Sequence, residues 1–273
     1  MKTKIIHKIL LSINSIPFIR DKLFRVSTTY IDIYRGFSYD IKTNGEKDLV
    51  NNISNIFSDE IIFFDVGANI GNWTSEAICK FKTYDGHLFE MSVPTYENLI
   101  KRCGDNKKLT INNIAISDSD GELEYRDFGE NSGVNTLLTN AEYHKKDSII
   151  KKTPVTTGDS YCSKNNISRI HLLKIDTEGA EYSVLSGFKD MLSKGLIDVI
   201  QFEYGYTHAD SYTLMRDFYN LLESYGYIIG ALRKDGVKFK KFSYSDNDFK
   251  SGPNYIACLP KHEYQLSKFI SSH

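Results

Sequence analysis

Short apolar runs recur along the chain from residue 61 onward, and each one ends in polar or glycine-containing sequence. Runs of four to eight apolar residues between turn formers are typical of strands buried in a sheet. Segments with a helical repeat of apolar residues separate them. Strands that alternate with helices in this way predict a doubly wound α/β fold with a mostly parallel sheet. The five strands are expected at residues 61–66, 86–90, 109–116, 170–176 and 198–204.

The helices between these strands are expected at residues 71–81, 94–103, 180–192 and 212–225. After the third strand the helical repeat lapses, and residues 122–128 and 154–157 have the alternating pattern of strands. This predicts a β-rich insertion with a loop over residues 129–152. Residues 227–232 and 255–259 are expected to close the sheet as an antiparallel C-terminal hairpin with a long polar connection.

Residues 1–60 are expected to form a partly helical N-terminal extension before the main domain, residues 61–273. Within the extension, residues 29–34 can pair as an extra strand. The first 25 residues combine basic side chains with spaced apolar ones, but their apolar runs are too short for a signal peptide or a membrane span. We expect a helix packed on the domain, and the alternative is peripheral binding to an anionic membrane face. The expected location is therefore the cytoplasm, with the inner membrane face as the alternative.

Composition fits one large globular domain with small additions, since 41% of the 273 residues are hydrophobic and 25% are charged. The net charge is −1, so no overall basic field indicates a nucleic-acid partner. The four cysteines are scattered and form no C-x-x-C pair, which argues against a zinc ribbon and a disulfide framework. Reduced thiols fit the cytoplasm best. The sequence does not indicate an oligomeric state.

The segment Asp65-Val-Gly-Ala-Asn-Ile-Gly71 follows the first apolar run, and it predicts a strand that ends at a tight turn and opens a helix. Glycine allows positive φ and close approach of the backbone to a ligand. The G-x-x-x-G spacing is not the G-x-G-x-x-G of dinucleotide enzymes. We expect a cofactor loop that holds no pyrophosphate, and a purely structural turn is the alternative. Its candidate binding residues are Asp65, Gly67, Ala68, Asn69, Gly71 and Asn72.

Polar residues also stand at the carboxyl ends of the other predicted strands. In an open parallel sheet, ligands bind at these ends, beside the point where the strand order reverses. Glu90 is therefore expected to accept both ribose hydroxyls of a nucleoside cofactor. Ser117 and Asp118 are expected at the adenine edge, although they also belong to a good turn sequence. Asp176 and Glu203 end the fourth and fifth strands.

Taken together and in order, several segments resemble the FkbM family of methyltransferases. They are Asp65–Gly71, Phe89-Glu90 with Pro94, Asn113–Ser117 with Asp120-Gly121, Leu173–Glu181 and Gln201-Phe202-Glu203. The resemblance covers roughly residues 60–205. It implies a class I Rossmann-like fold, the cofactor S-adenosylmethionine, and methylation of hydroxyl groups on sugars or polyketide-derived products. The chain departs mildly from the family pattern at Glu90-Met91-Ser92 and at Thr157-Gly158-Asp159.

A hydroxyl acceptor needs help in losing its proton. Asp176, which also borders the expected cofactor site, is the first choice for general base or substrate-orienting carboxylate. Glu178, Glu203 and His208 are the alternatives, and capping of the following helix is the structural explanation for Asp176 and Glu178. These four residues are also suitable ligands for Mg²⁺ or Mn²⁺. The sequence does not show that they converge, so a divalent metal is not predicted.

The resulting hypothesis is an S-adenosylmethionine-dependent O-methyltransferase that acts on a sugar hydroxyl, in a cell-surface glycan or a glycosylated metabolite. One alternative is an NAD-dependent oxidoreductase, in which Glu90 would bind a ribose in the same way. The spacing of the two glycines disfavours it. The other alternative is a non-catalytic, cofactor-binding scaffold of a glycan assembly complex.

Overall fold

The computed structural model describes residues 2–35, 38, 40–129, 132–142, 148–249 and 254–269. The chain forms two compact units, Met1–Phe37 and Ser38–His273. The first unit contains two helices, α1 (Lys2–Asn14) and α2 (Pro17–Arg35). Residues 29–34 lie within α2, so the expected extra strand is wrong: the helical repeat of apolar residues in α2 continues through this stretch.

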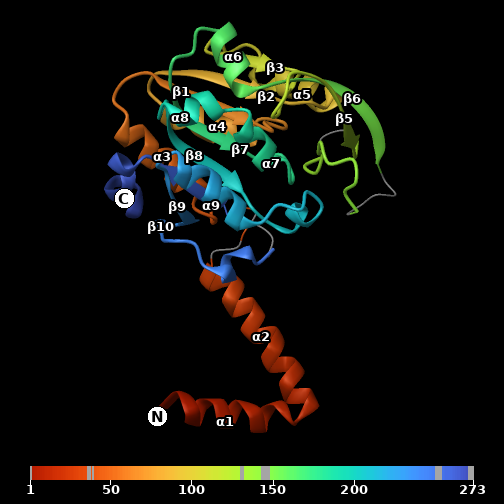
Figure 1. The fold of residues 1–273 in the computed structure, drawn as a ribbon, viewed down its shortest axis with the longest axis vertical. Coiled ribbons are helices and arrows are strands. Elements are labelled where there is room, and N and C mark those ends of the chain that lie inside the picture. The colour runs from red at the N-terminus through yellow and green to blue at the C-terminus, as the bar shows by residue number, and fades with distance from the viewer. Residues whose placement is uncertain are drawn as a thin grey trace. The chain divides into compact units, whose positions relative to one another are not determined.

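The second unit is built on an eight-stranded sheet with the order β10-β9-β11-β8-β7-β1-β2-β3 (Figure 1). The strands from β8 to β3 in this order pair in parallel, and β11 pairs antiparallel with both β8 and β9. This order confirms the class I methyltransferase Rossmann-like fold. The strands are β1 (Ile61–Val66), β2 (Tyr84–Phe89), β3 (Leu109–Asn112), β7 (Ile170–Ile175), β8 (Ile197–Glu203), β9 (Ile228–Arg233), β10 (Gly236–Phe239) and β11 (Asn254–Cys258).

Helices cover both faces of this sheet and enclose two separate cores. The neighbouring side chains Phe63 and Phe64 of β1 belong to opposite cores, as expected when successive strand residues point to opposite faces. The first core is formed with α3 (Glu46–Ile56), α4 (Asn72–Lys80), α5 (Val93–Cys103) and α10 (Glu263–Ser267). The second is formed with α6 (Gly158–Lys164), α7 (Glu181–Ser186), α8 (Lys189–Ser193) and α9 (Met215–Ser224).

The compact units divide at residue 37 rather than at residue 60. Helix α3 buries Leu49, Val50 and Ile53 against the sheet, so residues 38–60 are part of the second unit. No helix among the described residues is long and apolar enough to span a membrane.

The β-rich insertion is present as a second sheet with the order β4-β6-β5. Its strands are β4 (Ala115–Ile116), β5 (Gly121–Asp127) and β6 (Ile149–Thr156). Strand β6 begins earlier than expected, so the connecting loop is shorter. The closing pair β9 and β11 is confirmed as antiparallel, and the expected connection between them contributes β10, which pairs with β9.

Two predicted elements are each divided in the structure. The expected strand over residues 109–116 leaves the main sheet after Asn112, because the side chain of Asn113 turns to donate hydrogen bonds to the backbone oxygens of Glu90 and Met91. The expected helix over residues 180–192 is interrupted at Gly187. A Cβ atom there would lie 2.0 Å from the backbone oxygen of Ser117, so this close crossing requires glycine.

A buried carboxylate joins the amino ends of β7 and β8 to the C-terminal segment. Asp198 is fully buried and accepts hydrogen bonds from Arg169 and His262, and Lys261 lies 2.8 Å away. Burial alone would raise the pKa of Asp198, but the hydrogen bonds from His262, Arg169 and Lys261 outweigh it and hold the pKa well below its usual range.

We predict that Asp198→Asn lowers the free energy of unfolding by about 3 kcal/mol at pH 7, because it removes the charge of a fully buried carboxylate that accepts hydrogen bonds from three basic side chains. A carboxyl group with a lowered pKa stabilises the fold above its unfolded pKa of about 4 and loses that contribution as the pH falls. The difference in free energy of unfolding between the unmodified protein and Asp198→Asn, measured by urea unfolding, should therefore be smaller at pH 3 than at pH 7. Asp190→Asn, at a largely exposed site, is the matched control and should cost less than about 0.5 kcal/mol. Equal losses in the two variants would contradict this account.

Candidate functional site

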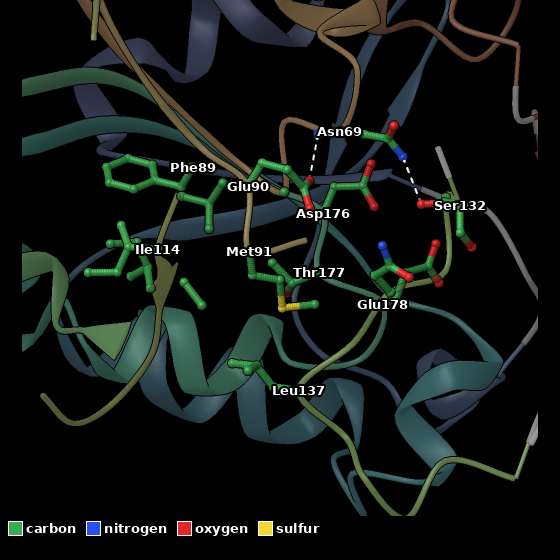
Figure 2. Close-up of a pocket in the computed structure, with 16 residues that line it drawn as sticks. Asn69, Phe89, Glu90, Met91, Ile114, Ser132, Leu137, Asp176, Thr177 and Glu178 are labelled. Carbon is green, nitrogen blue, oxygen red and sulfur yellow. Dashed lines mark hydrogen bonds between the residues drawn. The ribbon is translucent and has the colours of Figure 1, made fainter. Parts of the chain in front are cut away.

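A pocket lies at the carboxyl ends of β1, β2 and β7, beside the point where the strand order reverses (Figure 2). We call it the strand-end pocket. One side is apolar and is lined by Phe89, Met91, Ile114 and Ile116. The other side is polar. It is lined by Gly67, Asn69, Glu90, Ser132, Asp176 and Glu178.

Glu90 is buried at the end of β2, and its carboxyl group is oriented by the backbone. One oxygen accepts a hydrogen bond from the N–H of Asn69 and the other from the N–H of Ser92. A carboxylate oxygen has two lone pairs, so each of them can accept one more hydrogen bond. Two such oxygens match the neighbouring hydroxyls of a ribose. Burial raises the pKa of Glu90 to about 7, although the two backbone hydrogen bonds oppose the shift.

The glycine loop after β1 is shaped by its contacts with β2 and β7. Gly67 has φ +80, and a Cβ atom there would lie 1.8 Å from the backbone oxygen of Asp176. The N–H groups of Gly67 and Ala68 both donate to the backbone oxygen of Phe89. The glycine is therefore required for the close approach of β1 and β7, and its backbone lines the strand-end pocket as a result.

Asp65 does not line the strand-end pocket. It is fully buried, where one carboxylate oxygen accepts a hydrogen bond from Thr74 and the other lies 3.1 Å from the Nζ atom of Lys174. The same Nζ atom lies 3.2 Å from Asp176. Burial alone would lower the pKa of Lys174, but the charges of Asp176 and Asp65 outweigh it and raise the pKa, so the side chain stays charged. Lys174 therefore pairs with both Asp65 and Asp176.

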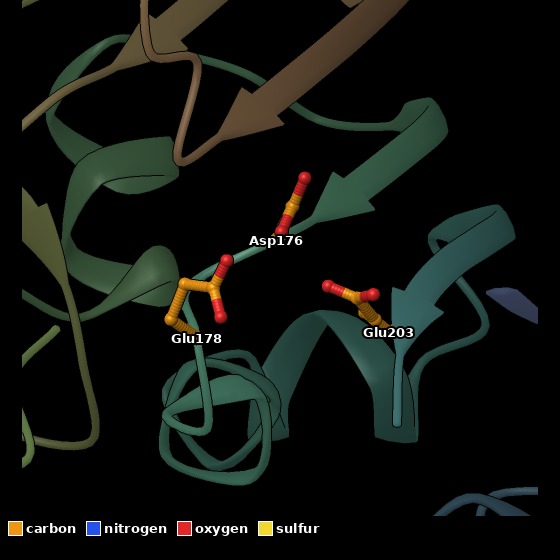
Figure 3. A group of neighbouring side chains, drawn as sticks. All are labelled: Asp176, Glu178 and Glu203. Carbon is orange, nitrogen blue, oxygen red and sulfur yellow. The ribbon is translucent and has the colours of Figure 1, made fainter. Parts of the chain in front are cut away.

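Three carboxyl groups converge next to the strand-end pocket (Figure 3). Oxygen atoms of Asp176, Glu178 and Glu203 all lie within 4.8 Å of one another. They line a second cavity together with Glu46 of α3, Asn44, Asn254 and Tyr206. We call it the acidic hollow. Asp176 and Glu178 line both cavities, so they stand at the boundary between them.

Two of these carboxyl groups have a pKa well above the usual value for a glutamate. Burial raises the pKa of Glu178 and of Glu203, and the neighbouring charge of Asp176 raises both further. Glu178 also has an unusual backbone conformation, with φ +54, and its carbonyl oxygen accepts a hydrogen bond from the hydroxyl of Thr136. The insertion loop thus fixes the turn that carries Glu178.

His208 does not join the carboxyl cluster. Its Nε2 atom lies 3.0 Å from the buried carboxylate of Glu181, and its Nδ1 atom accepts a hydrogen bond from the N–H of Gly205. Glu181 in turn accepts hydrogen bonds from the N–H groups of Thr177 and Gly179. The His208–Glu181 pair therefore supports the turn that carries Glu178, and it leaves no ring nitrogen of His208 to face the acidic hollow.

The remaining candidates from the loop and the adenine edge do not line the strand-end pocket. Gly71 has φ +79 and packs closely against Leu99 of α5, and Asn72 accepts a hydrogen bond from Arg102. Ser117 is buried, and its hydroxyl is directed to Asp118. Ala68 is buried as well. The apolar residues before Ser117, namely Ile114, Ala115 and Ile116, line the pocket in its place.

The carboxyl cluster offers only oxygen ligands, which is the donor set that Mg²⁺, Mn²⁺ and Ca²⁺ prefer. Lys174 already neutralises part of the negative charge of Asp176. Burial and the charge of Asp176 raise the pKa values of Glu178 and Glu203, so protons would compete with an ion for these carboxyl oxygens.

Glu46 was not predicted as a site residue, since it lies in the part of the chain that was expected to be an extension. Its carboxylate accepts hydrogen bonds from Gln201 of β8 and Asn44. Burial raises the pKa of Glu46, and the charge of Asp176 adds to the shift. In the sequence Glu46 stands beside Asp48 as one of two acidic residues in the first turn of α3, which is typical of a helix start and does not by itself indicate a site. The insertion loop at residues 132–137 was also not predicted to reach the strand-end pocket.

Comparison with known proteins gives a family match. The model of the FkbM methyltransferase domain matches residues 65–229, which is more than half of the chain. A search of curated protein sequences found no match.

Solved structures of methyltransferases are similar to this chain at low sequence identity. A precorrin-6y C5,15-methyltransferase from Geobacter metallireducens is 12% identical, with a TM-score of 0.41 over 81% of this chain and 90% of that one. The M. capricolum protein TrmK, solved with S-adenosyl-homocysteine, is 9% identical, with a TM-score of 0.42 over 82% and 70% of the two chains. SMU.1697c, a putative methyltransferase from Streptococcus mutans solved with the same compound, is 10% identical, with a TM-score of 0.43 over 78% and 96%.

We predict that Lys174→Met lowers the free energy of unfolding by about 3–5 kcal/mol, because it leaves the buried carboxylate of Asp65 without its cation. Lys194→Met, at an exposed site, is the matched control and should cost less than about 1 kcal/mol. Urea denaturation at pH 7 measures both. A loss for Lys174→Met no larger than that for Lys194→Met would show that Asp65 does not depend on this pair.

Proposed function

The chain belongs to the FkbM methyltransferase family, and on this basis we propose that it transfers a methyl group from S-adenosylmethionine to a hydroxyl group of a sugar. The methyltransferase activity follows from the family, which also decides against the oxidoreductase alternative. The proposal adds the acceptor: a sugar unit of a cell-surface glycan or a glycosylated metabolite, methylated in the cytoplasm.

The residues of the strand-end pocket suit the cofactor. Glu90 offers two oriented carboxylate oxygens for the ribose hydroxyls, and Met91, Ile114 and Ile116 offer an apolar surface for the adenine ring. When bound, S-adenosylmethionine supplies a methyl group that is already activated on a sulfonium. The protein therefore has to align the acceptor and remove the proton of its hydroxyl group.

One observation carries the proposal: Asp176 lines both the strand-end pocket and the acidic hollow. An acceptor hydroxyl held in the hollow can donate a hydrogen bond to this carboxylate, which then accepts the proton as the oxygen gains a methyl group. Lys174 fixes the other side of the Asp176 carboxylate through its contact at 3.2 Å. The raised pKa values of Glu178 and Glu203 favour their protonated forms, which can donate hydrogen bonds to other acceptor oxygens.

The lining of the acidic hollow supports a neutral, polyhydroxylated acceptor. Its carboxyl and amide groups are hydrogen-bonding partners for hydroxyls, and the ring of Tyr206 offers a surface on which a sugar can stack. Four carboxyl groups at one cavity disfavour a phosphate-rich acceptor, since ionised members of the group repel anions. We therefore propose a neutral sugar rather than RNA or DNA.

We predict that Asp176→Asn lowers kcat by at least about 100-fold, because it removes the proton acceptor, while S-adenosylhomocysteine binding changes less than about fivefold. Asp235→Asn, the same change at an exposed turn, should alter neither quantity.

The assay follows methyl transfer from labelled S-adenosylmethionine to a panel of neutral methyl glycosides, with RNA transcripts alongside. Transfer to RNA alone would refute the sugar proposal, and full turnover by Asp176→Asn would refute the role of this carboxylate. No turnover with any acceptor would support a scaffold.

The raised pKa of Glu90 predicts a pH-dependent affinity for the nucleoside part of the cofactor. An ionised carboxylate can accept hydrogen bonds from both ribose hydroxyls. A carboxyl group with a pKa of about 7 is about one-tenth ionised at pH 6 and about nine-tenths ionised at pH 8. Calorimetry with 5′-methylthioadenosine, which has no group that titrates in this range, should show binding that tightens about tenfold from pH 6 to pH 8. Glu90→Gln should bind more weakly and without this pH dependence. A flat profile for the unmodified protein would exclude this role of Glu90.

A further inference from the structure

The two helices of the unit Met1–Phe37 expose large apolar side chains. In α1, Ile5, Ile6 and Ile9 are each more than half exposed, and α2 buries none of its residues. Val26 and Ile33 of α2 are 59% and 72% exposed. Apolar side chains in water are costly, and a contiguous set of them on a protein marks a surface that binds another partner.

The exposed residues of α2 lie on one face. Ile19, Leu23, Val26, Tyr30 and Ile33 follow one another at alternating spacings of four and three residues, which places them along a single stripe. In α1, Ile5, Ile6, Ile9 and Leu10 share a face by the same rule. Each helix therefore has an apolar face and a polar face.

Charge separates this unit from the rest of the chain. Residues 1–37 carry seven basic side chains and two acidic ones, Asp21 and Asp32, which gives a net charge of +5. The whole chain carries −1, so the remaining residues carry −6. The basic residues are Lys2, Lys4, Lys8, Arg20, Lys22, Arg25 and Arg35.

We propose that α1 and α2 bind the surface of a membrane that contains anionic phospholipids. Amphipathic helices with a basic polar face lie in the plane of such a surface, with the apolar face among the upper acyl chains and the basic side chains at the headgroups. Each Lys or Arg near an anionic surface strengthens binding by about fivefold. A second copy of this unit is a weaker candidate, because two units of +5 repel each other.

This proposal is independent of the acceptor, and it is consistent with the finding that no described helix is suited to span a membrane. In this proposal the protein associates peripherally with the membrane surface. A methyltransferase held there would meet acceptors that are themselves attached to the membrane at a raised local concentration.

The test measures binding of the full-length chain to vesicles by sedimentation. Vesicles of phosphatidylcholine alone are compared with vesicles that contain phosphatidylglycerol as well. We expect binding to the anionic vesicles that weakens with salt, and at least about tenfold weaker binding to the neutral ones. Binding to neither kind of vesicle would overturn the proposal.

A pair of variants separates insertion of the apolar stripe from simple charge attraction. Val26→Asp places a charge within the stripe, whereas Thr28→Asp places the same charge two residues further along, on the opposite side of α2. We expect Val26→Asp to weaken binding to anionic vesicles at least about tenfold more than Thr28→Asp. Circular dichroism and S-adenosylhomocysteine binding check that both variants are folded.

Equal losses in the two variants would overturn insertion of the stripe. Sedimentation velocity gives the remaining outcome: a dimer that Val26→Asp abolishes, without vesicle binding by the unmodified protein, would assign the stripe to a second copy and overturn the membrane proposal.

Discussion

The site depends on one buried cation. Lys174 of β7 lies between Asp65 of β1 and Asp176 at the end of its own strand, with distances of 3.1 and 3.2 Å. The pairing of β1 with β7 sets Asp65 directly opposite Lys174, so the sheet itself fixes this geometry. Removing one partner of a buried ion pair leaves an uncompensated charge, which costs more than the pair contributes. Lys174 therefore holds together the two strands between which the strand order reverses, and it orients the carboxylate that borders both cavities.

This arrangement divides the polar residues at the strand ends into two kinds. Asp65, Glu181 and His208 are fully buried and bind other groups of the protein. Asp65 pairs with Lys174, whereas Glu181 pairs with His208 and also accepts hydrogen bonds from backbone N–H groups. Glu90, Asp176 and Glu178 line cavities that a ligand can enter. The buried residues with protein partners stabilise the turns that hold the cavity-lining residues in place. A carboxylate at a strand end is thus either part of the scaffold or part of the site, and what distinguishes the two is whether it lines a cavity, since Glu90 is also buried and hydrogen-bonded.

Sequence patterns predicted the fold well because the apolar strands are buried on both faces and leave strong signals. They predicted less well where a single glycine or amide decided the path, as at Gly187, which interrupts a helix, and at Asn113, which ends a strand. For the site, the strand-end rule placed Glu90, Asp176 and Glu203 correctly near the cavities. It could not place Glu46, because no sequence pattern shows that α3, which precedes the first strand of the sheet, brings this residue to Gln201 of β8. It also could not show that His208 turns toward Glu181, since that contact depends on tertiary packing.

The acidic hollow has four carboxyl groups, and their surroundings oppose the ionisation of three of them. Burial and mutual repulsion raise the pKa values of Glu46, Glu178 and Glu203, and Lys174 balances Asp176. A protonated carboxyl group can donate a hydrogen bond, whereas an ionised one can only accept, so raised pKa values favour a cavity that presents donors as well as acceptors. A sugar hydroxyl is both a donor and an acceptor, so each hydroxyl of one ring can find a complementary partner. A phosphate offers only hydrogen-bond acceptors, and its negative charge would be repelled by the carboxylate of Asp176. The raised pKa values in the hollow therefore support the proposed neutral sugar acceptor, for a physical reason that the residue types alone would not reveal.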